Sequence, residues 1–267
     1  ELLRTRAGAD MLRATRNGFT ANQLYSTASY QERDLQGIKF GGDRLGKWNL
    51  SAQDLRRATL IGCDLTQANL QSADLRGADL LAADLTGANL AFSDQRGAKN
   101  VFVQDPDSAL VRNSISPAGL IDGLHLLPDD HLVVRDDPLA VSVEKAFELF
   151  PGGTLEFVLE DAEWTSAITP AEGLTPSLGG TLVVSLAKGV DPLALLGAHF
   201  NLFDWNTAPN DQFSSVHTPA GTLWDLSDLY GSGEVRLTAV HALGDVDGDG
   251  RVDLTDFGAV KMHFGGS

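Results

Sequence analysis

Apolar residues recur with a period of five in the N-terminal third of the chain. Every fifth position from residue 35 to residue 90 is apolar, which gives the series Leu35, Phe40, Leu45, Leu50, Leu55, Leu60, Leu65, Leu70, Leu75, Leu80, Leu85 and Leu90. Tyr25 and Tyr30 extend the same phase toward the N-terminus, and the pattern fails at Gln95 and Asn100. The chain therefore contains an internal repeat over about residues 25–100.

A period of five is incompatible with both a regular helix and a flat strand. Five residues of α-helix turn through about 500°, so successive leucines would be offset by about 140° and could share no face. In a flat strand an odd period would place successive leucines on opposite sides of the sheet. The leucines can share one interior only if each unit is a short extended piece followed by a corner.

The stretch ADLRGADLLAADLTGANL, residues 73–90, resembles the pentapeptide-repeat family. The resemblance implies a right-handed quadrilateral β-helix of about twenty residues per coil, with the leucines in the core and small residues beside them. Cys63 lies at one of the small positions, so we interpret it as a core residue that replaces Ala, not as a reactive thiol. We expect this β-helix over residues 25–104, preceded by an N-terminal cap segment over residues 1–24.

The pattern changes to alternating apolar residues over 105–243. It predicts strands at 131–135, 139–143, 154–159, 181–186, 198–203, 222–226 and 234–240. The segments PGGTLEFVLE and LGGTLVVSLA match at a spacing of 27 residues. This spacing suits further rungs of a wider β-solenoid, or the paired strands of a sandwich. We favour the solenoid, because it would cover the open C-terminal end of the repeat stack.

The segment DVDGDGRVDLTD near the C-terminus has the spacing of an EF-hand calcium loop. Its expected calcium ligands are Asp245, Asp247, Asp249, the backbone carbonyl of Arg251, Asp253 and Asp256. Asp256 stands where calmodulin-like loops carry Glu, so we expect weak binding, with a Kd of about 10⁻⁵ to 10⁻³ M. Apolar residues at helical spacing after the loop predict one helix.

A calcium loop that leads into one helix, with a strand-like segment before it, resembles the dockerin repeat, here at residues 244–264. Dockerins carry two such repeats and this chain has one, so the copy would either lock the C-terminus or dock on a partner receptor. The order of the parts also resembles that in large secreted proteins of planctomycete-type bacteria. These parts are a pentapeptide stack, a β-rich region and a dockerin-like module over 244–267. This similarity implies an extracellular or cell-surface location, with a signal peptide already removed.

Charge divides the chain at the boundary between the two patterns. The net charge is −16, of which residues 1–104 carry +2 and residues 105–267 carry −18. The acidic half disfavours nucleic-acid binding, and the slightly positive stack disfavours DNA mimicry, which requires a negative rod. No stretch approaches the length of about 18 apolar residues that a membrane helix needs, so no membrane insertion is expected.

No group of residues has the spacing of a catalytic site. The six histidines lie singly, without metal-ligand spacing. We interpret the adjacent acids as turn residues, because neighbours in a strand point to opposite faces; these pairs are Asp129–Asp130, Asp136–Asp137 and Glu160–Asp161. Trp164, Trp205 and Trp224 could form a sugar-binding platform, but buried strand aromatics are the expected case.

The sequence thus predicts an all-β, non-enzymatic, calcium-stabilised structural protein outside the cell. It would self-associate or form a scaffold through its β-helix ends, in a homo-oligomer or fibre or with a protein partner. The alternatives are a carbohydrate-binding or carbohydrate-active surface protein with an extracellular glycan as ligand, and a dockerin-like module that docks on a receptor. Calcium is the one cofactor that the sequence predicts.

Overall fold

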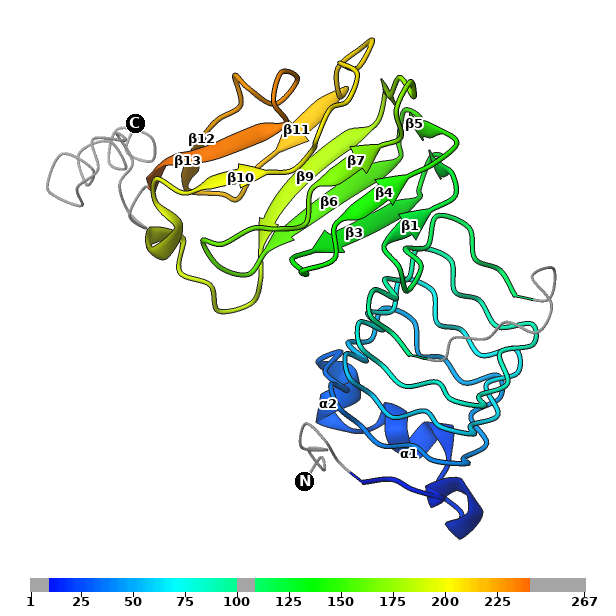
Figure 1. Ribbon diagram of the computed structural model, residues 1–267. Helices are drawn as coiled ribbons and strands as arrows, with labels where there is room; N and C mark the ends of the chain where they lie inside the picture. The colour runs from blue at the N-terminus through cyan, green and yellow to red at the C-terminus, as the bar shows by residue number, and fades with distance from the viewer. Residues whose placement is uncertain (1–9, 100–108, 241–267) are drawn as a thin grey trace, which may run out of the picture.

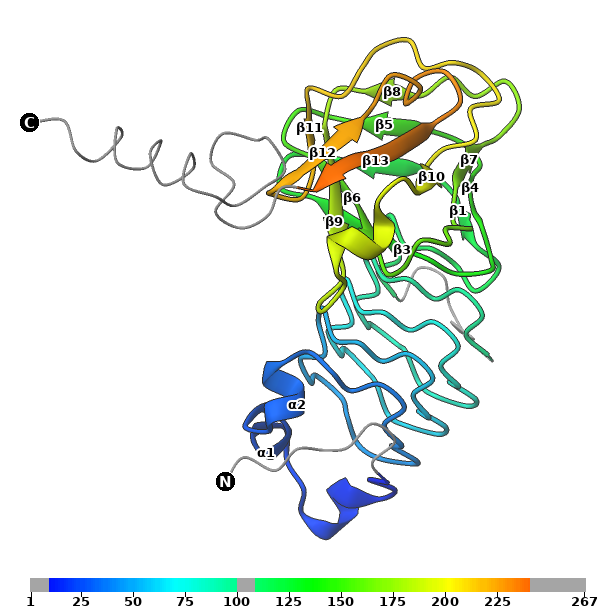
Figure 2. The same cartoon turned by 90° about the vertical axis from the view of Figure 1, so that its left-hand side faces the viewer.

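The computed structural model describes residues 10–99 and 109–240. The calcium loop at 245–256 and the helix expected after it lie outside these residues. Figures 1 and 2 show a stack of narrow coils in the N-terminal half and a broader, strand-rich stack in the C-terminal half, which meet at an angle. Short helices lie at the N-terminal end of the narrow stack (Figure 1).

Three short helices form the N-terminal cap: η1 (Ala14–Asn17), α1 (Ala21–Tyr25) and α2 (Ala28–Gln31). Thr20 and Gln23 form a capping box at the start of α1, and the Thr27 side chain accepts a hydrogen bond from the Tyr30 N–H at the start of α2. The extension of the repeat phase back to Tyr25 and Tyr30 was therefore wrong. The threonine caps close helical turns there, and the repeat starts after α2.

The cap also binds the backbone edge of the first coil. The Tyr25 hydroxyl accepts from the Asn49 N–H, and the Tyr30 hydroxyl donates to the Asn49 C=O at 2.8 Å. On other sides of the same coil, the Arg44 N–H donates to the Thr15 hydroxyl, and Met11 pairs with the Lys39 carbonyl. These contacts replace a preceding coil, because an uncovered strand edge is a template for unwanted pairing.

The leucines of the repeat share one interior, as the period of five predicted. Coils pair in parallel every 20 residues, as in the series Asp34, Asp54, Asp74 and Asp94. Each apolar centre from Leu35 to Leu90 is at most 3% exposed. The predicted corner lies two positions after each centre, where the backbone has a positive φ at every fifth residue from Gly37 to Gly97.

The stack continues beyond the point where the leucine pattern fails. Gln95 occupies a centre position and is 4% exposed, and Asp94 pairs with Ile115 in the next coil. Asn89 likewise pairs with Leu110. Parallel coil pairing thus reappears on the C-terminal side of the expected boundary at residue 104, because backbone pairing does not require a leucine in every unit.

The C-terminal half is a wider stack of parallel rungs with three sheets, in the orders β1-β4-β7, β2-β5-β8 and β11-β9-β6-β3. Its rungs are β1 (Leu120–Ile121), β2 (Leu124–Leu126), β3 (His131–Arg135), β4 (Val141–Val143), β5 (Phe147–Leu149), β6 (Thr154–Leu159), β7 (Ile168–Pro170), β8 (Ser177–Leu178), β9 (Thr181–Leu186) and β11 (Ser215–His217). β6 pairs with β9 at Leu155 and Leu182, which is the 27-residue spacing seen in the sequence. Parallel pairing fits the solenoid and not the sandwich.

An antiparallel sheet covers the far end of the wider stack. It consists of β10 (His199–Asn201), β13 (Glu234–Val240) and β12 (Thr222–Asp225), and η2 (Pro192–Leu195) leads into it. Phe200 from this sheet and Phe203 beyond β10 are fully buried in the same core as Phe157 of β6. All seven predicted strands are present, whereas β1, β2, β5, β7, β8 and β11, with two or three residues each, were not predicted.

Adjacent leucines test the packing of the narrow stack. Leu80 is 1% exposed and Leu81 is 49% exposed. We expect Leu80→Ala to lower the free energy of unfolding by about 2–5 kcal/mol, because it leaves a cavity in the leucine ladder. Leu81→Ala, as the control, should change it by less than about 0.5 kcal/mol. Urea unfolding measures both, and equal effects would contradict the assigned interior.

Cys63 offers a chemical test of the same interior. The side chain is 1% exposed, its thiol donates to the Phe40 carbonyl, and burial raises the pKa of the thiol to about 11. We expect iodoacetamide at about pH 8 to leave the folded protein unlabelled and to label it fully in denaturant, because the thiolate is the nucleophile. Mass spectrometry measures the label, and rapid labelling without denaturant would be the opposing result.

Candidate functional site

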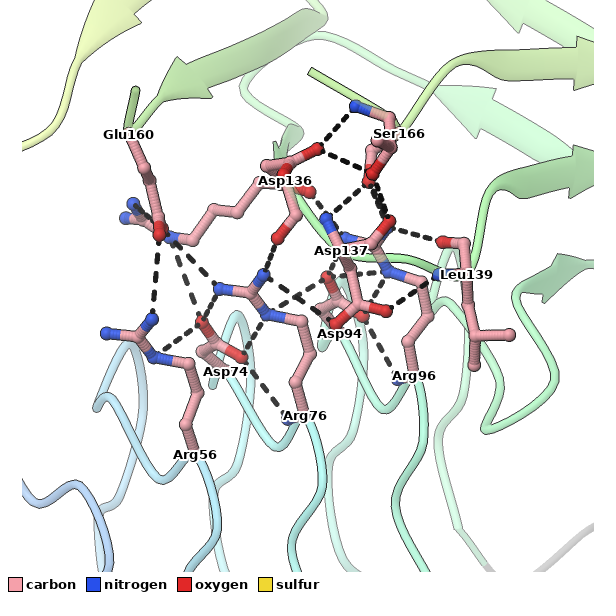
Figure 3. Close-up of polar contacts among 12 residues, drawn as sticks. Arg56, Asp74, Arg76, Asp94, Arg96, Asp136, Asp137, Leu139, Glu160 and Ser166 are labelled. Carbon is pink, nitrogen blue, oxygen red and sulfur yellow. Dashed lines mark hydrogen bonds and ion pairs between the residues drawn. The ribbon is translucent and has the colours of Figure 1, made fainter. Parts of the chain in front are cut away.

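Three arginines repeat along the side of the narrow stack that faces the wider one. Arg56, Arg76 and Arg96 lie at the same position in successive coils, and we call them the arginine ladder. Each guanidinium pairs with the aspartate two residues earlier, at 2.7 Å for Asp54, 2.8 Å for Asp74 and 2.6 Å for Asp94. Figure 3 shows the ladder reaching up toward residues of the wider stack.

Arg96 is the innermost member and is completely buried. Besides the Asp94 carboxylate, its guanidinium donates to the Ser166 hydroxyl at 2.8 Å and to the carbonyls of Leu139 at 2.8 Å and Arg135 at 2.7 Å. A buried charge is tolerated only with a counter-charge and satisfied hydrogen bonds, and Arg96 has both. One side chain of the narrow stack therefore binds three segments of the wider stack (Figure 3).

Arg76 and Arg56 continue the contact outward. Arg76 donates to the Asp136 carbonyl and lies 3.6 Å from the Glu160 carboxylate, which is also 3.7 Å from Arg56. Burial alone would lower the pKa of Arg76, but Asp74, Asp94 and Glu160 more than offset this and raise it. A hydrogen bond to Asp54 is the main cause that raises the pKa of Arg56. Arg56 and Arg76 thus stay charged across the working pH range.

A polar cleft with a volume of about 800 Å³ lies beside the arginine ladder. One wall is the narrow stack, with Arg33, Asp34 and Asp54. The other wall is formed by outward side chains of β3 and β6 and by the segment after β9, including Lys188. A second pocket, at the N-terminal cap, has a volume of about 370 Å³, so the cleft is the larger of these two candidate ligand sites.

Two residues of the cleft wall, His131 and Glu156, form a hydrogen-bonded group with Ser185. His131 Nε2 lies 2.7 Å from Glu156 Oε2, and the Ser185 hydroxyl donates to Glu156 Oε1 at 2.5 Å. The hydrogen bond from His131 is the main cause that lowers the pKa of Glu156. The serine contacts the carboxylate and not the imidazole, so the group lacks the contact between nucleophile and base that nucleophilic catalysis needs.

The adjacent acids of the sequence have structural partners. Asp130 binds Arg112 at 2.8 Å, and Asp136 accepts from the Thr165 N–H at 2.7 Å. Asp137 accepts from the Leu139 N–H, and Asp161 accepts from the Glu163 N–H. Asp137 and Asp161 thus have the local side chain-to-backbone bond of turn residues, whereas Asp130 and Asp136 bind residues distant in sequence and Glu160 pairs with Arg56 and Arg76. Among the described residues, 10–99 and 109–240, no group of three or more His, Cys, Asp or Glu side chains is placed to bind a metal ion.

The three tryptophans of the wider stack pack against its core. Trp205 stacks on Phe203 with ring centroids 4.2 Å apart, and its indole N–H donates to the Leu229 carbonyl. Trp224 packs on Phe200, and Trp164 meets Phe157 edge to face. All three rings are partly buried against the core, and Trp224 lies in β12, whereas Trp164 and Trp205 lie outside the strands; the interpretation as buried strand aromatics is therefore confirmed in part.

The structure does not describe the expected calcium ligands. Asp245, Asp247, Asp249, Arg251, Asp253 and Asp256 lie outside the described residues, so the calcium loop stays a prediction. The arginine ladder was not predicted at all. A signal for it was present in the sequence, because the motif Asp-x-Arg recurs at 54–56, 74–76 and 94–96, one coil apart.

Comparisons with known proteins support the narrow stack. Residues 49–98 match the family model for pentapeptide repeats, with 8 copies. A search of curated proteins gives no significant match. The chain is 32% identical to a pentapeptide repeat protein from the Arabidopsis thaliana thylakoid lumen over 32% of this chain and 62% of that one, with a TM-score of 0.15. It thus spans less than two thirds of that relative.

A second solved structure is also a pentapeptide repeat protein. It is HetL, described as involved in heterocyst differentiation regulation, from the cyanobacterium Nostoc. The identity is 16% over 69% of this chain and 86% of HetL, with a TM-score of 0.20. Within the described ranges, no helix is long and apolar enough to cross a membrane.

Arg96 is the residue with which to test the contact between the stacks. Arg96→Met keeps much of the volume but removes the closest counter-charge of the buried Asp94 carboxylate, which retains only Arg76 at 3.8 Å. We expect the free energy of unfolding to fall by about 3–5 kcal/mol, measured by urea denaturation. Arg57→Met, at an exposed position in the same unit as Arg56, should change it by less than about 0.5 kcal/mol. Equal effects of the two substitutions would contradict a structural role for Arg96.

Proposed function

We propose that this chain is a non-enzymatic structural scaffold that holds protein partners at fixed positions outside the cell. The observation that supports the proposal most strongly is the use of charge at the contact between the stacks. Arg56 and Arg76 pair with the Glu160 carboxylate of the wider stack, and Arg96 donates to two backbone carbonyls and to the Ser166 hydroxyl of that stack. A buried contact of this kind suits a rigid bent frame.

The continuity of the frame is a second support. Each narrow coil is hydrogen-bonded to the next, and the wider stack continues the core without a linker between Ile115 and Ile121. Repeat proteins of this kind act through extended surfaces and not through a single deep pocket. A scaffold needs such rigidity, because it must present several partners at a constant spacing.

We place the proposed contacts with partners away from the two ends of the frame, because both ends are covered. The cap around Tyr25 and Tyr30 holds the first coil, and the sheet of β10, β12 and β13 covers the last rungs. Head-to-tail stacking through the β-helix ends would require these caps to move. We therefore propose that partners bind along the sides of the frame or at the C-terminal segment.

We propose a calcium-dependent role for that C-terminal segment. Carboxylates at Asp245, Asp247, Asp249, Asp253 and Asp256 repel one another without a cation, and bound calcium would remove this repulsion. The segment would then act as a dockerin-like module or as a lock on the chain end. Its weak expected affinity suits the near-millimolar calcium outside cells, and this supports a secreted or cell-surface location.

The mass of the native particle tests this proposal. We expect an assembly larger than the 28.4 kDa chain in millimolar calcium and a return to the single chain in EDTA. Light scattering behind a sizing column measures both. Asp245→Ala should abolish the difference, whereas Asp122→Ala, which removes only an exposed ion pair with Lys145, should preserve it.

The opposing result is equally clear. The proposal fails if the chain stays at 28.4 kDa in calcium and in EDTA, and if amide exchange over 245–264 is the same in both.

A further inference from the structure

β3 is the edge strand of its sheet, and this edge lies on the side of the narrow stack. The sheet order is β11-β9-β6-β3, so β3 pairs with β6 on one side and faces the narrow stack on the other. His131, Val133 and Arg135 of this strand line the cleft. The narrow stack does not extend this sheet, because no coil strand is hydrogen-bonded to β3 among the described residues.

The register of the sheet shows which backbone groups face the cleft side. The Thr154 N–H donates to the Asp130 carbonyl at 2.8 Å, and His131 lies opposite Thr154 in parallel register. Successive residues of a strand direct their backbone groups to opposite sides. Leu132 and Val134 therefore bind β6, whereas His131, Val133 and Arg135 direct their N–H and C=O groups away from it.

The arginine ladder supplies hydrogen-bond donors only to the carbonyls at the C-terminal end of this edge. Arg96 donates to the Arg135 carbonyl at 2.7 Å, and Arg76 donates to the Asp136 carbonyl (Figure 3). Over the described ranges, no protein group bonds to the backbone of His131 or Val133 on the open side. This differs from the first coil, where the tyrosine hydroxyls bind both backbone groups of Asn49.

We propose that the cleft binds an extended peptide segment of another protein, which adds to β3 as a further strand. Strand addition uses a row of unpaired backbone groups for affinity and side-chain contacts for specificity. His131 and Val133 supply the backbone groups, and Val133 and Val158 supply an apolar patch beside them. The proposal rests on the proposed scaffold function, to which it adds the class of partner.

Charge indicates which peptides fit the cleft. Its lining side chains include six carboxylates but only four guanidinium or ammonium groups. A peptide that alternates apolar residues with lysine would place its charges opposite this excess. An oligosaccharide fits less well, because the lining residues include no Phe, Tyr or Trp ring on which a sugar could stack.

Peptide binding to the full chain tests the proposal. The probes are two synthetic peptides of one length, one that alternates Val with Lys and one that alternates Val with Glu. We expect the lysine peptide to bind about tenfold more tightly by calorimetry. It should also slow the amide exchange of His131 and Val133, because their N–H groups then donate to the added strand.

Two substitutions at one position supply the control. Val133→Pro removes a backbone donor that β6 does not use, and edge strands tolerate proline, so the fold should persist while binding is lost. Val133→Thr keeps the donor and the branched side chain, and should bind the lysine peptide as the unaltered chain does. If Val133→Pro fails to fold, the exchange of His131 and Val133 in the unaltered chain decides the question.

Failure of this inference differs from failure of the scaffold proposal. Equal binding to Val133→Pro and the unaltered chain, or exchange slowed elsewhere than at β3, would overturn strand addition. Binding of xylo-oligosaccharide in the cleft, with neither peptide bound, would assign the cleft to a sugar. In either case a calcium-dependent assembly would leave the scaffold proposal standing.

Discussion

The backbone groups at the edge of each coil must find hydrogen-bond partners, and the rest of this structure depends on how that requirement is met. Inside the stacks the next coil supplies them, at every rung. At the N-terminal end two tyrosine hydroxyls and a threonine hydroxyl replace the missing coil. At the contact between the stacks, arginine side chains bind the carbonyls at the end of β3. His131 and Val133 of β3 keep an edge without a partner among the described residues, and both residues line the cleft.

Buried charge fixes the angle between the two stacks. Burial of Arg96 would be costly if any of its donors lost a partner, because the remaining charges would be left in a low dielectric. Its partners come from Asp94 in the narrow stack and from residues 135, 139 and 166 in the wider one. A change in the angle would break several of these bonds at once. The same angle leaves room for the cleft, so the stabilising contact and the candidate binding site have one geometric cause.

The sequence predicted the parts of the fold that a repeated pattern encodes. The period of five located the leucine interior and the corners, and the 27-residue echo gave the register of β6 and β9. Tyr25 and Tyr30 lie at positions that match the period of five but do not belong to the repeat, because the threonine caps stabilise helices in that segment. The shortest strands have too few residues to show a period. To predict the arginine ladder from the sequence, one would have to recognise a period of 20 residues and also know which residues face it. The partners of Arg96 in the wider stack are distant in sequence, so no local pattern indicates them. The cleft depends on the angle between the stacks, which no local pattern encodes.

The open edge of β3 can be measured directly in the free protein by amide hydrogen exchange, residue by residue. Amides that donate to a neighbouring strand exchange slowly, whereas amides that face water exchange fast. The account predicts slow exchange for Leu132 and Val134, slow exchange for Asn49 under its tyrosine cap, and fast exchange for His131 and Val133. Equally slow exchange along the whole of β3 would mean that its edge is already covered, and would contradict the account.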